Sequence, residues 1–251
     1  MKRYYDELSV RSYDADESGR VKPSSLFNYF QEAAWQHAER LGFGYHALLE
    51  RDLFWVISRI RLQWLRPLRW GDHLVLETWP KGISKLFALR DFVIRNAEGE
   101  DAVRATSGWL TLEVESKRPR RPDRIMDPSV MLEEDHAISE LPGKPSVPPE
   151  LEEADRRVAR YSDLDVNKHV NNARYVDWVF DAFPLDGSSE TPFSELLVQF
   201  SGEALRGEEV IVQRNVEMDT GGCYASIVTA ADGRSICEAA AVLNGIGDGG
   251  H

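Results

Sequence analysis

Residues 161–178 read YSDLDVNKHVNNARYVDW and form the stretch around which the rest of the sequence is organised. Within it Asp165, Asn167 and His169 occupy every second position. A period of two is that of one face of an extended segment, so we expect the three side chains to point the same way. A helix should follow, because apolar residues then recur at the spacing of one buried helical face: Val176, Val179, Phe180 and Phe183.

The start of this expected helix has the chemistry of an anion site. Asn171 or Asn172 is a suitable N-cap, and the first turn of a helix carries backbone N–H groups without intrahelical partners. A carbonyl oxygen that gains negative charge during acyl transfer requires such donors. We therefore take the backbone N–H groups of Val170, Asn171 and Asn172 as candidates for an oxyanion site. A lone histidine in a polar turn is usually a capping or packing residue, but three polar side chains before an apolar helix favour a catalytic role.

The same order of elements occurs twice along the chain: one strand, a polar turn, a long helix and four strands. The strands alternate apolar and polar residues, which is typical of antiparallel sheets with one buried face. In the first half the helix opens at Pro23 and stops at Gly42, and the expected strands are 4–12, 53–66, 73–80, 85–96 and 101–115. In the second half the expected helix is 172–183, and the expected strands are 154–161, 194–203, 208–218, 221–231 and 234–244. The predicted fold class is α+β.

Residues 117–150 separate the two halves. They carry seven of the twelve prolines and a run of charges, and they show no sustained hydrophobic period. Such a composition is typical of a linker. We therefore divide the chain into a first domain over residues 1–116, a linker over 117–150 and a second domain over 151–251.

An offset of about 149 residues aligns the two halves. It pairs three positions of the polar turns: Asp16 with Asp165, Ser18 with Asn167, and Arg20 with His169. The first half thus keeps the frame of the turn without its amide and its imidazole. We expect one active site per chain, in the second half, with the first half contributing walls to it.

The order Asp-x-Asn-x-His-Val-Asn-Asn-x-x-Tyr over residues 165–175 resembles the signature of the acyl-acyl carrier protein (acyl-ACP) thioesterases, a hotdog-fold family that ends fatty acid synthesis. Further stretches of the first half follow in that family's order: Arg11–Asp14, Leu26–Ala34, Trp55–Arg59, Trp70–Asp72, Glu77–Trp79, Arg90–Phe92, Arg104–Ser107 and Trp109. Each tryptophan alone indicates only core packing, so the order carries the resemblance. It implies two tandem hotdog domains, each a long helix wrapped by an antiparallel sheet, with the acyl pocket in the first and catalysis in the second.

The resemblance adds a glutamate to the candidate site. The family places a catalytic Glu at the end of the strand after the second helix, usually followed by Cys, and the matching residues here are Glu203 and Ala204. Because Ala204 has no thiol, a Cys–His mechanism is excluded and a carboxylate mechanism is left. Either Asp165 or Glu203 activates water or attacks the thioester directly. His169 orients the carboxylate or moves a proton, and Asn167 positions water or substrate.

The formal charge of −12 argues against a duplex nucleic acid partner. A positive stretch nevertheless lies in the linker and contains four cations: Lys117, Arg118, Arg120 and Arg121. A local patch can steer an acidic partner, so these four are candidates for docking acyl carrier protein (ACP), the partner that the resemblance implies; a solvated linker is the alternative. No cofactor or metal is expected, because the other histidines are scattered and no Gly-rich nucleotide loop is present.

The sequence predicts a cytoplasmic protein. No window is long and apolar enough for a membrane span, and the first residues lack a signal core or the plastid transit segment that plant members of the resembled family carry. Cys223 and Cys237 should stay reduced, because a two-residue turn at Asp232 and Gly233 would place them on opposite sides of the sheet. We expect a bacterial-like monomer or homodimer.

These observations lead to the hypothesis of a hydrolase that cleaves the thioester of fatty acyl-ACP and releases free fatty acid and holo-ACP. Two alternatives stay open: an acyl-CoA thioesterase of the same fold, and a non-catalytic protein that binds acyl thioesters on a hotdog frame. A hotdog dehydratase is disfavoured, because those enzymes place their acid and their histidine differently.

Overall fold

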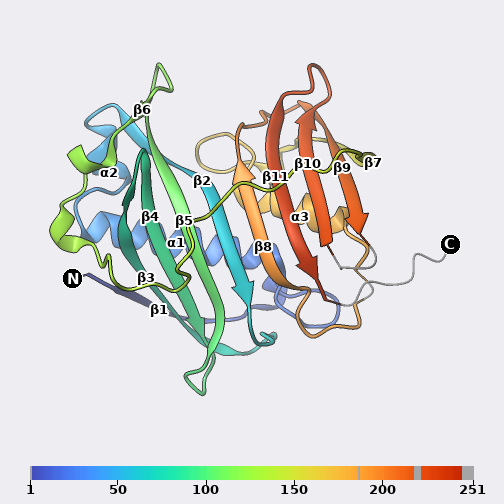
Figure 1. Cartoon of the computed structure of the whole chain (residues 1–251), viewed down its shortest axis with the longest axis horizontal. Helices are drawn as coiled ribbons and strands as arrows, with labels where there is room; N and C mark the ends of the chain where they lie inside the picture. The colour runs from blue at the N-terminus through green and yellow to red at the C-terminus, as the bar shows by residue number, and fades with distance from the viewer. Residues whose placement is uncertain (1, 186, 218–221, 245–251) are drawn as a thin grey trace.

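The computed structural model describes residues 2–185, 187–217 and 222–244, and the strands in these ranges form one eleven-stranded antiparallel sheet (Figure 1). The strand order is β1-β3-β4-β5-β2-β8-β11-β10-β9-β7, and β6 pairs with β5. The strands are β1 (Tyr4–Ser9), β2 (Leu53–Trp64), β3 (His73–Ser84), β4 (Phe87–Arg95), β5 (Asp101–Glu113), β6 (Pro119–Arg120), β7 (Glu152–Val158), β8 (Phe193–Phe200), β9 (Glu209–Glu217), β10 (Gly222–Thr229) and β11 (Ser235–Leu243). The α-helices are α1 (Pro23–Arg40), α2 (Tyr45–Leu49) and α3 (Asn172–Ala182).

The predicted strands and the two predicted helices are present, with three differences in the first half. The first strand ends at Ser9, because Ser12–Asp14 form a 3-10 turn. Strand β3 continues to Ser84, since the expected turn around Pro80 and Gly82 is a bulge: the pairing register shifts there and Gly82 has φ 152°. The short helix α2 was not predicted.

The two halves share one sheet because β2 pairs with β8, from Arg59 opposite Gln199 to Gln63 opposite Glu195. The helices α1 and α3 lie on the same face of this sheet and pack against each other (Figure 1). The predicted arrangement of a long helix covered by antiparallel strands is therefore confirmed, and it occurs twice. No helix in the described ranges is long and apolar enough to cross a bilayer.

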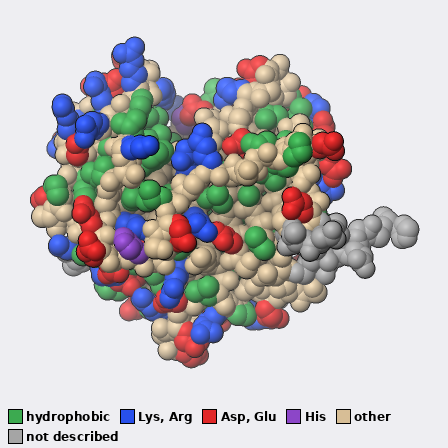
Figure 2. All heavy atoms as spheres, in the orientation of Figure 1, with side chains coloured by type: hydrophobic (Ala, Val, Ile, Leu, Met, Phe, Trp, Pro, Cys, Tyr) green, Lys and Arg blue, Asp and Glu red, His purple; other side chains and the backbone are tan. Residues whose placement is uncertain are grey.

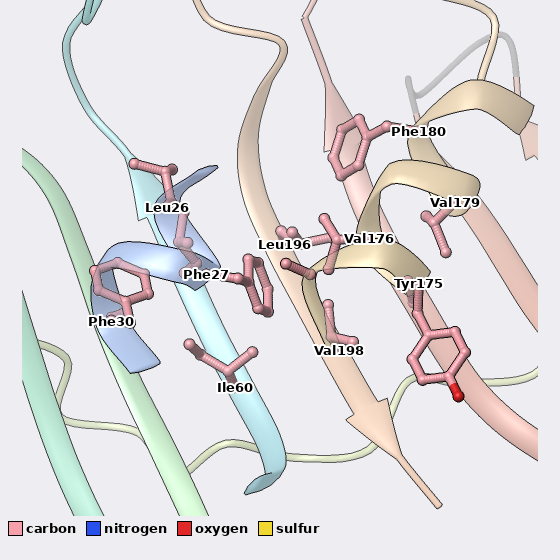
Figure 3. Close-up of a cluster of buried hydrophobic side chains, with 14 of the residues drawn as sticks. Leu26, Phe27, Phe30, Ile60, Tyr175, Val176, Val179, Phe180, Leu196 and Val198 are labelled. Atoms are coloured by element: carbon pink, nitrogen blue, oxygen red, sulfur yellow. The ribbon is translucent and has the colours of Figure 1, made fainter. Parts of the chain in front are cut away.

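The apolar core is continuous between the halves (Figure 3). Phe27 and Phe30 of α1 and Val176 of α3 are at most 2% exposed. They belong to one cluster with Ile60 of β2 and Val198 of β8. Burying one such side chain stabilises the folded state by about 1.5–3 kcal/mol. The two halves are therefore joined by a shared core as well as by a shared sheet.

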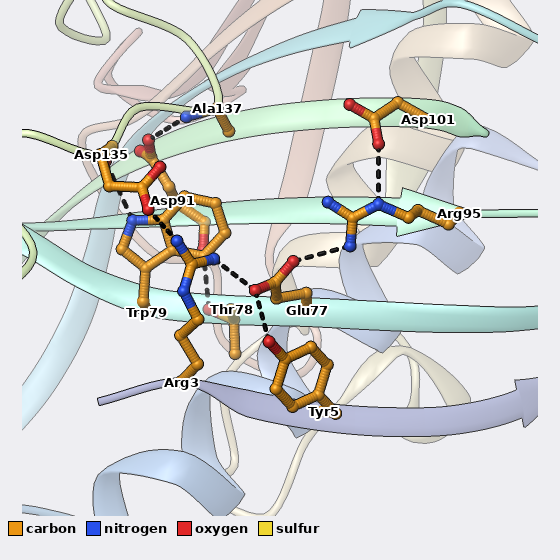
Figure 4. Close-up of polar contacts among 10 residues, drawn as sticks. All are labelled: Arg3, Tyr5, Glu77, Thr78, Trp79, Asp91, Arg95, Asp101, Asp135 and Ala137. Carbon is orange, nitrogen blue, oxygen red and sulfur yellow. Dashed lines mark hydrogen bonds and ion pairs between the residues drawn. The ribbon is translucent and has the colours of Figure 1, made fainter. Parts of the chain in front are cut away.

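The segment that was expected to be a linker is partly packed against the first-half strands (Figure 4). The indole N–H of Trp79 donates to the carbonyl of Asp135 (3.0 Å), and the backbone N–H of Ala137 donates to Asp91 Oδ2 (2.7 Å). Asp91 also forms a buried ion pair with Lys81 (3.4 Å). Burial raises the pKa of the Asp91 carboxyl, while the hydrogen bond from Ala137 and the charge of Lys81 oppose the rise. A buried polar network thus fixes the path of this segment.

Candidate active site

Residues 163–171 form a tight turn that leads into α3. Asp165 Oδ1 accepts hydrogen bonds from the backbone N–H groups of Asn167 (2.8 Å) and His169 (3.3 Å), and the Asp165 N–H donates to the His169 carbonyl (2.9 Å). Lys168 lies in the left-handed region with φ 66°. The expectation of an extended segment is wrong here, because the Asp165 carboxylate folds the chain back on itself. The side chain of Asn167 is exposed beside this turn.

His169 and Glu203 are brought together by this turn. Strand β8 ends at Phe200, before the expected end at residue 203, and the backbone of Leu205 then pairs with that of His169. As a result His169 Nδ1 lies 3.2 Å from Glu203 Oε2, with the two side chains 29% and 50% exposed. A solvent-accessible carboxylate and imidazole at this distance can together take a proton from water. Within the described ranges no group of three His, Cys, Asp or Glu side chains is placed to hold a metal ion.

Helix α3 begins at Asn172, and the Asn171 side chain caps it by accepting a hydrogen bond from a backbone N–H of the first turn (2.9 Å). The predicted N-cap is therefore confirmed. The expected oxyanion role of two other groups is wrong for this structure, because the Val170 N–H donates to the Ala204 carbonyl (3.1 Å) and the Asn171 N–H donates to the Asp163 carbonyl (2.9 Å). These two bonds build the turn itself, so Asn172 is left as the candidate donor.

The first half repeats the turn without the imidazole. Asp16 Oδ1 accepts hydrogen bonds from the backbone N–H groups of Ser18 and Arg20, both at 2.9 Å. These are the counterparts of the bonds that Asp165 makes in the second half. Since Asp16 shapes a turn in which no imidazole follows, turn formation accounts for the contacts of Asp165. Glu203 is then the acid that faces the imidazole.

A pocket of about 210 Å³ lies at the first-half turn, between α1 and α3. Residues of both halves line it, including Arg20 and Phe180. The Arg20 guanidinium donates to Asp16 Oδ2 (2.9 Å) and to the carbonyl oxygens of Gly187 and Ser189 (2.7 Å each). Arg20 therefore stands at the first-half position that corresponds to His169. Its guanidinium binds backbone carbonyls of the second half.

Two residues to which the sequence assigned no role contact the Glu203–Ala204 peptide. Arg234 Nη1 donates to the Glu203 carbonyl (3.1 Å), and the Ala204 N–H donates to the Tyr175 hydroxyl (2.8 Å). Tyr175 closes the motif quoted above, and the offset of about 149 residues pairs it with Leu26. This difference between the halves was therefore visible in the sequence. No comparable signal pointed to Arg234, which follows a hairpin loop.

Cys223 and Cys237 are free and buried. The expected register between their strands is wrong by one residue, because the loop between β10 and β11 is longer than a two-residue turn: Cys237 pairs with Ile227, and Cys223 pairs with Ala241. Both thiols lie in the same core cluster. Burial raises the pKa of the Cys223 thiol to about 11, and it also raises that of Cys237. Neither is suited to be a nucleophile at neutral pH.

The four docking candidates are exposed at the turn between β5 and β6, and Figure 2 shows Lys and Arg side chains gathered at the end of the molecule where Figure 1 places this turn. They are Lys117, Arg118, Arg120 and Arg121. Two of them are paired locally, Arg120 with Glu113 and Arg121 with Asp123. The Lys117 ammonium lies 4.7 Å from the centre of the Phe54 ring. The patch is thus accessible but partly neutralised.

This patch lies at the same end of the sheet as the acid–imidazole pair. Glu113, at the end of β5, is opposite Leu53, the first residue of β2. Strand β8 runs toward that same end, because it is antiparallel to β2 and its Gln199 is opposite Arg59. Glu203 follows beyond the end of β8, so a partner bound at the β5–β6 turn would lie at the end of the molecule that holds the Glu203–His169 pair.

The shared sheet, and a turn followed by a helix in each half, define a protein of two joined hotdog units. An acid–imidazole pair lies at one of the two turns. The model of the acyl-ACP thioesterase N-terminal domain matches residues 1–129, and the model of the C-terminal domain matches residues 149–244. This chain belongs to the acyl-ACP thioesterase family.

Two curated relatives are similar over most of the chain. A palmitoyl-acyl carrier protein thioesterase of Cuphea hookeriana is 26% identical over 247 residues, which cover 89% of this chain and 57% of the relative. Oleoyl-acyl carrier protein thioesterase 1 of Arabidopsis thaliana is 23% identical over 265 residues, which cover 98% of this chain and 73% of the relative. The chain thus spans little more than half the length of the first of these relatives.

Two solved structures share the fold along almost the whole chain. An acyl-ACP thioesterase from Bacteroides thetaiotaomicron superposes with a TM-score of 0.81 at 21% identity, over 97% of this chain and 98% of that one. The 12:0-ACP thioesterase from Umbellularia californica superposes with a TM-score of 0.82 at 23% identity, with the same coverage of both chains. At these identities the superpositions show that the double hotdog fold is shared.

Proposed function

We propose that this chain is a thioester hydrolase that converts fatty acyl-ACP to free fatty acid and holo-ACP, the reaction that ends fatty acid synthesis. The observation that carries the proposal is the 3.2 Å contact of His169 with Glu203, which occurs at only one of two turns of the same shape. Family membership supports the substrate class, since the two relatives above are named as acyl carrier protein thioesterases.

In the proposed reaction the Glu203–His169 pair removes a proton from a water molecule, whose oxygen attacks the thioester carbonyl carbon. The C–S bond then breaks, and the proton passes from the pair to the departing thiolate, which needs little further help to leave. Asn167 positions the water or the carbonyl through its amide. The N–H of Asn172 stabilises the oxyanion at the start of α3, where the helix dipole also favours negative charge. Asp165 keeps the turn in shape.

Thiol release from acyl-ACP over a series of chain lengths tests this function. Glu203→Gln should lower kcat by about 10²–10⁴-fold, because an amide cannot take a proton. Glu195→Gln is the matched control, since Glu195 is a part-exposed glutamate at the other end of β8 and pairs with Arg61. Equal turnover by the wild type and Glu203→Gln on every chain length would refute the catalytic role. A wild type that binds acyl-ACP without turnover would instead be the non-catalytic binding protein.

We propose that the cations at the β5–β6 turn dock ACP. Replacing Arg118, Arg120 and Arg121 together by alanine should raise the KM for acyl-ACP by about tenfold, because rim charges govern the encounter with an acidic partner. The KM for acyl-CoA, which carries no protein surface, should change by less than about twofold. Faster turnover of acyl-CoA than of acyl-ACP, or an equal rise of both KM values, identifies an acyl-CoA thioesterase instead.

We also propose a division of work within the chain. Residues 1–116 form the unit that holds the acyl chain, residues 117–150 connect the units, and residues 151–251 form the catalytic unit. Because one chain already contains both units, a monomer should be active and a homodimer should not be required; sedimentation of the active species checks this. The two free thiols are compatible with the reducing cytoplasm, which we propose as the location.

A further inference from the structure

The Glu203–Ala204 peptide is held at both of its polar atoms. Its carbonyl oxygen accepts a hydrogen bond from Arg234 Nη1 (3.1 Å), and its N–H donates to the Tyr175 hydroxyl (2.8 Å). The following carbonyl, that of Ala204, accepts from the N–H of Val170 (3.1 Å), which directly follows the imidazole residue. The backbone at Glu203 and Ala204 is therefore hydrogen-bonded to α3 and to the turn that carries His169.

The backbone just before Glu203 is confined as well. The Gly202 N–H donates to the Ile236 carbonyl (3.1 Å). A Cβ at Gly202 would approach the Ser235 carbonyl oxygen to 2.8 Å and Arg234 Nη1 to 3.1 Å. Only glycine fits here without displacing neighbouring atoms. The backbone that leads to Glu203 therefore lies directly against β11 and cannot shift toward it.

Tyr175 is a rigid anchor for this peptide. It is 1% exposed, and its ring packs against those of Trp178 (centroids 5.5 Å apart) and Phe200 (6.4 Å). Figure 3 shows it projecting from α3 among the buried side chains. Burial raises the pKa of the Tyr175 phenol, so the hydroxyl stays neutral. A neutral hydroxyl on an immobile ring presents an acceptor to the Ala204 N–H at a fixed place.

The first half shows that the fold does not require this hydroxyl. There the Val21 N–H donates to the Leu68 carbonyl (2.9 Å), so the same contact between turn and strand end is present. The offset of about 149 residues places Leu26 at the position of the tyrosine. Leu68 accepts the bond that Ala204 accepts in the second half, so Pro67, which precedes it, stands at the position of the glutamate. The hydroxyl and the acid occur together in one half and are absent together from the other.

We propose that Tyr175 is a positioning residue for the hydrolysis: its hydroxyl fixes the Glu203–Ala204 peptide and thereby holds the Glu203 carboxylate against His169. This inference rests on the proposed function. A displacement of a catalytic group by about 1 Å can cost about 100-fold in rate, so a single hydrogen bond that fixes the peptide has a measurable kinetic effect.

Tyr175→Phe removes the hydroxyl and keeps the ring. We expect kcat for acyl-ACP to fall about tenfold while KM stays within about twofold, because the substrate contacts are unchanged. In the Glu203→Gln background the same substitution should have no further effect, since it acts through that carboxylate. Tyr224→Phe, at a 5% exposed tyrosine of β10, is the matched control and should keep the wild-type kcat. Equal losses from Tyr175→Phe in both backgrounds, or no loss in either, would overturn the proposal.

Amide hydrogen exchange gives a second readout that does not depend on turnover. The Ala204 N–H should exchange about tenfold faster in Tyr175→Phe than in the wild type, while the Val170 N–H stays protected. If the wild type hydrolyses no thioester, the proposed function fails, and this exchange still decides whether the hydroxyl holds the peptide. An unchanged Ala204 rate refutes the contact.

Arg234→Gln tests the same peptide from its other side if Tyr175→Phe does not fold. The Arg234 side chain is 45% exposed, so its replacement leaves the core intact. We expect kcat to fall about threefold, with no additional fall in the Glu203→Gln background. An unchanged kcat in this variant also overturns the positioning of Glu203 through its peptide.

Discussion

The two polar turns of this chain have the same backbone conformation but different side chains. Each places its fourth residue in the left-handed region, Gly19 with φ 76° in the first half and Lys168 with φ 66° in the second. The next residue is Arg20 in one turn, where it binds backbone carbonyls, and His169 in the other, where it faces Glu203. The aspartate thus determines the shape of each turn, while the residue four positions later determines whether the turn binds the other half of the chain or holds an imidazole against an acid.

Copying the first-half residue into the second half should have the largest effect. His169→Arg removes the imidazole that moves the proton, so kcat in the thiol-release assay should fall by about 10²–10⁴-fold. The fold should be preserved, because the first-half turn already accommodates arginine at this position, and thermal melting checks this. A variant that keeps more than about a tenth of the wild-type kcat would contradict the role of the imidazole.

Substitutions of the two aspartates separate turn formation from catalysis. Asp165→Asn keeps an oxygen acceptor for the turn, so kcat should stay within about tenfold of the wild type. Asp165→Ala should lower both kcat and the free energy of unfolding, the latter by about 1–2 kcal/mol. Asp16→Ala is the control and should lower only the stability. A loss for Asp165→Asn as large as that for Glu203→Gln would assign proton transfer or nucleophilic attack to Asp165.

Making the first-half turn resemble the second should affect stability alone. Arg20→His loses the bonds to the carbonyls of Gly187 and Ser189, and hydrogen bonds to charged groups contribute about 1.5–3 kcal/mol. We expect the free energy of unfolding in urea to fall by about 2 kcal/mol. The kcat should stay within about twofold of the wild-type value. The new histidine gains no acid partner, because Pro67 stands where the second half has Glu203. Unchanged stability would show that Arg20 does not help to join the halves.

Substitution of the two cysteines of the second half should have the smallest effect on turnover. Burial raises the pKa of Cys223 to about 11, so at pH 8 only about 0.1% of this thiol is ionised. Native protein should therefore react with a disulfide reagent only slowly, and rapidly after unfolding in urea. Cys223→Ala and Cys237→Ala should keep the wild-type kcat. Rapid reaction of the native protein with loss of turnover would restore a thiol mechanism.

Local patterns predicted much of the fold, and two of the exceptions share one cause. Apolar periodicity placed the strands and both long helices, and residue type placed the cap of the second helix at Asn171 or Asn172. The bulge at Gly82 and the register of Cys237 were missed, because each depends on how one strand pairs with its neighbour. A shift of one residue in such pairing exchanges the faces of a strand, and no local signal records it.

The candidate site also combines residues that the sequence predicted with contacts that only the folded chain shows. The residues Asp165, His169 and Glu203 were named from the motif and the family resemblance. The oxyanion assignment to Val170 and Asn171 failed because a helix start indicates which N–H groups lack partners within the helix, whereas segments distant in sequence supply their actual partners. The contact of Tyr175 with the Ala204 N–H could not be predicted either, because it joins a helix to the residue that follows a separate strand.

By itself the sequence determined the repeated order of strands and helices, the two aspartate turns and the replacement of an imidazole by Arg20, because capping, periodicity and turn chemistry act over a few neighbouring residues. Only the tertiary structure decided that β2 and β8 join the halves into one sheet, and that Glu203 lies beside His169 with its peptide held by Tyr175. These contacts depend on strand register and on packing between distant segments, which the whole folded chain sets together.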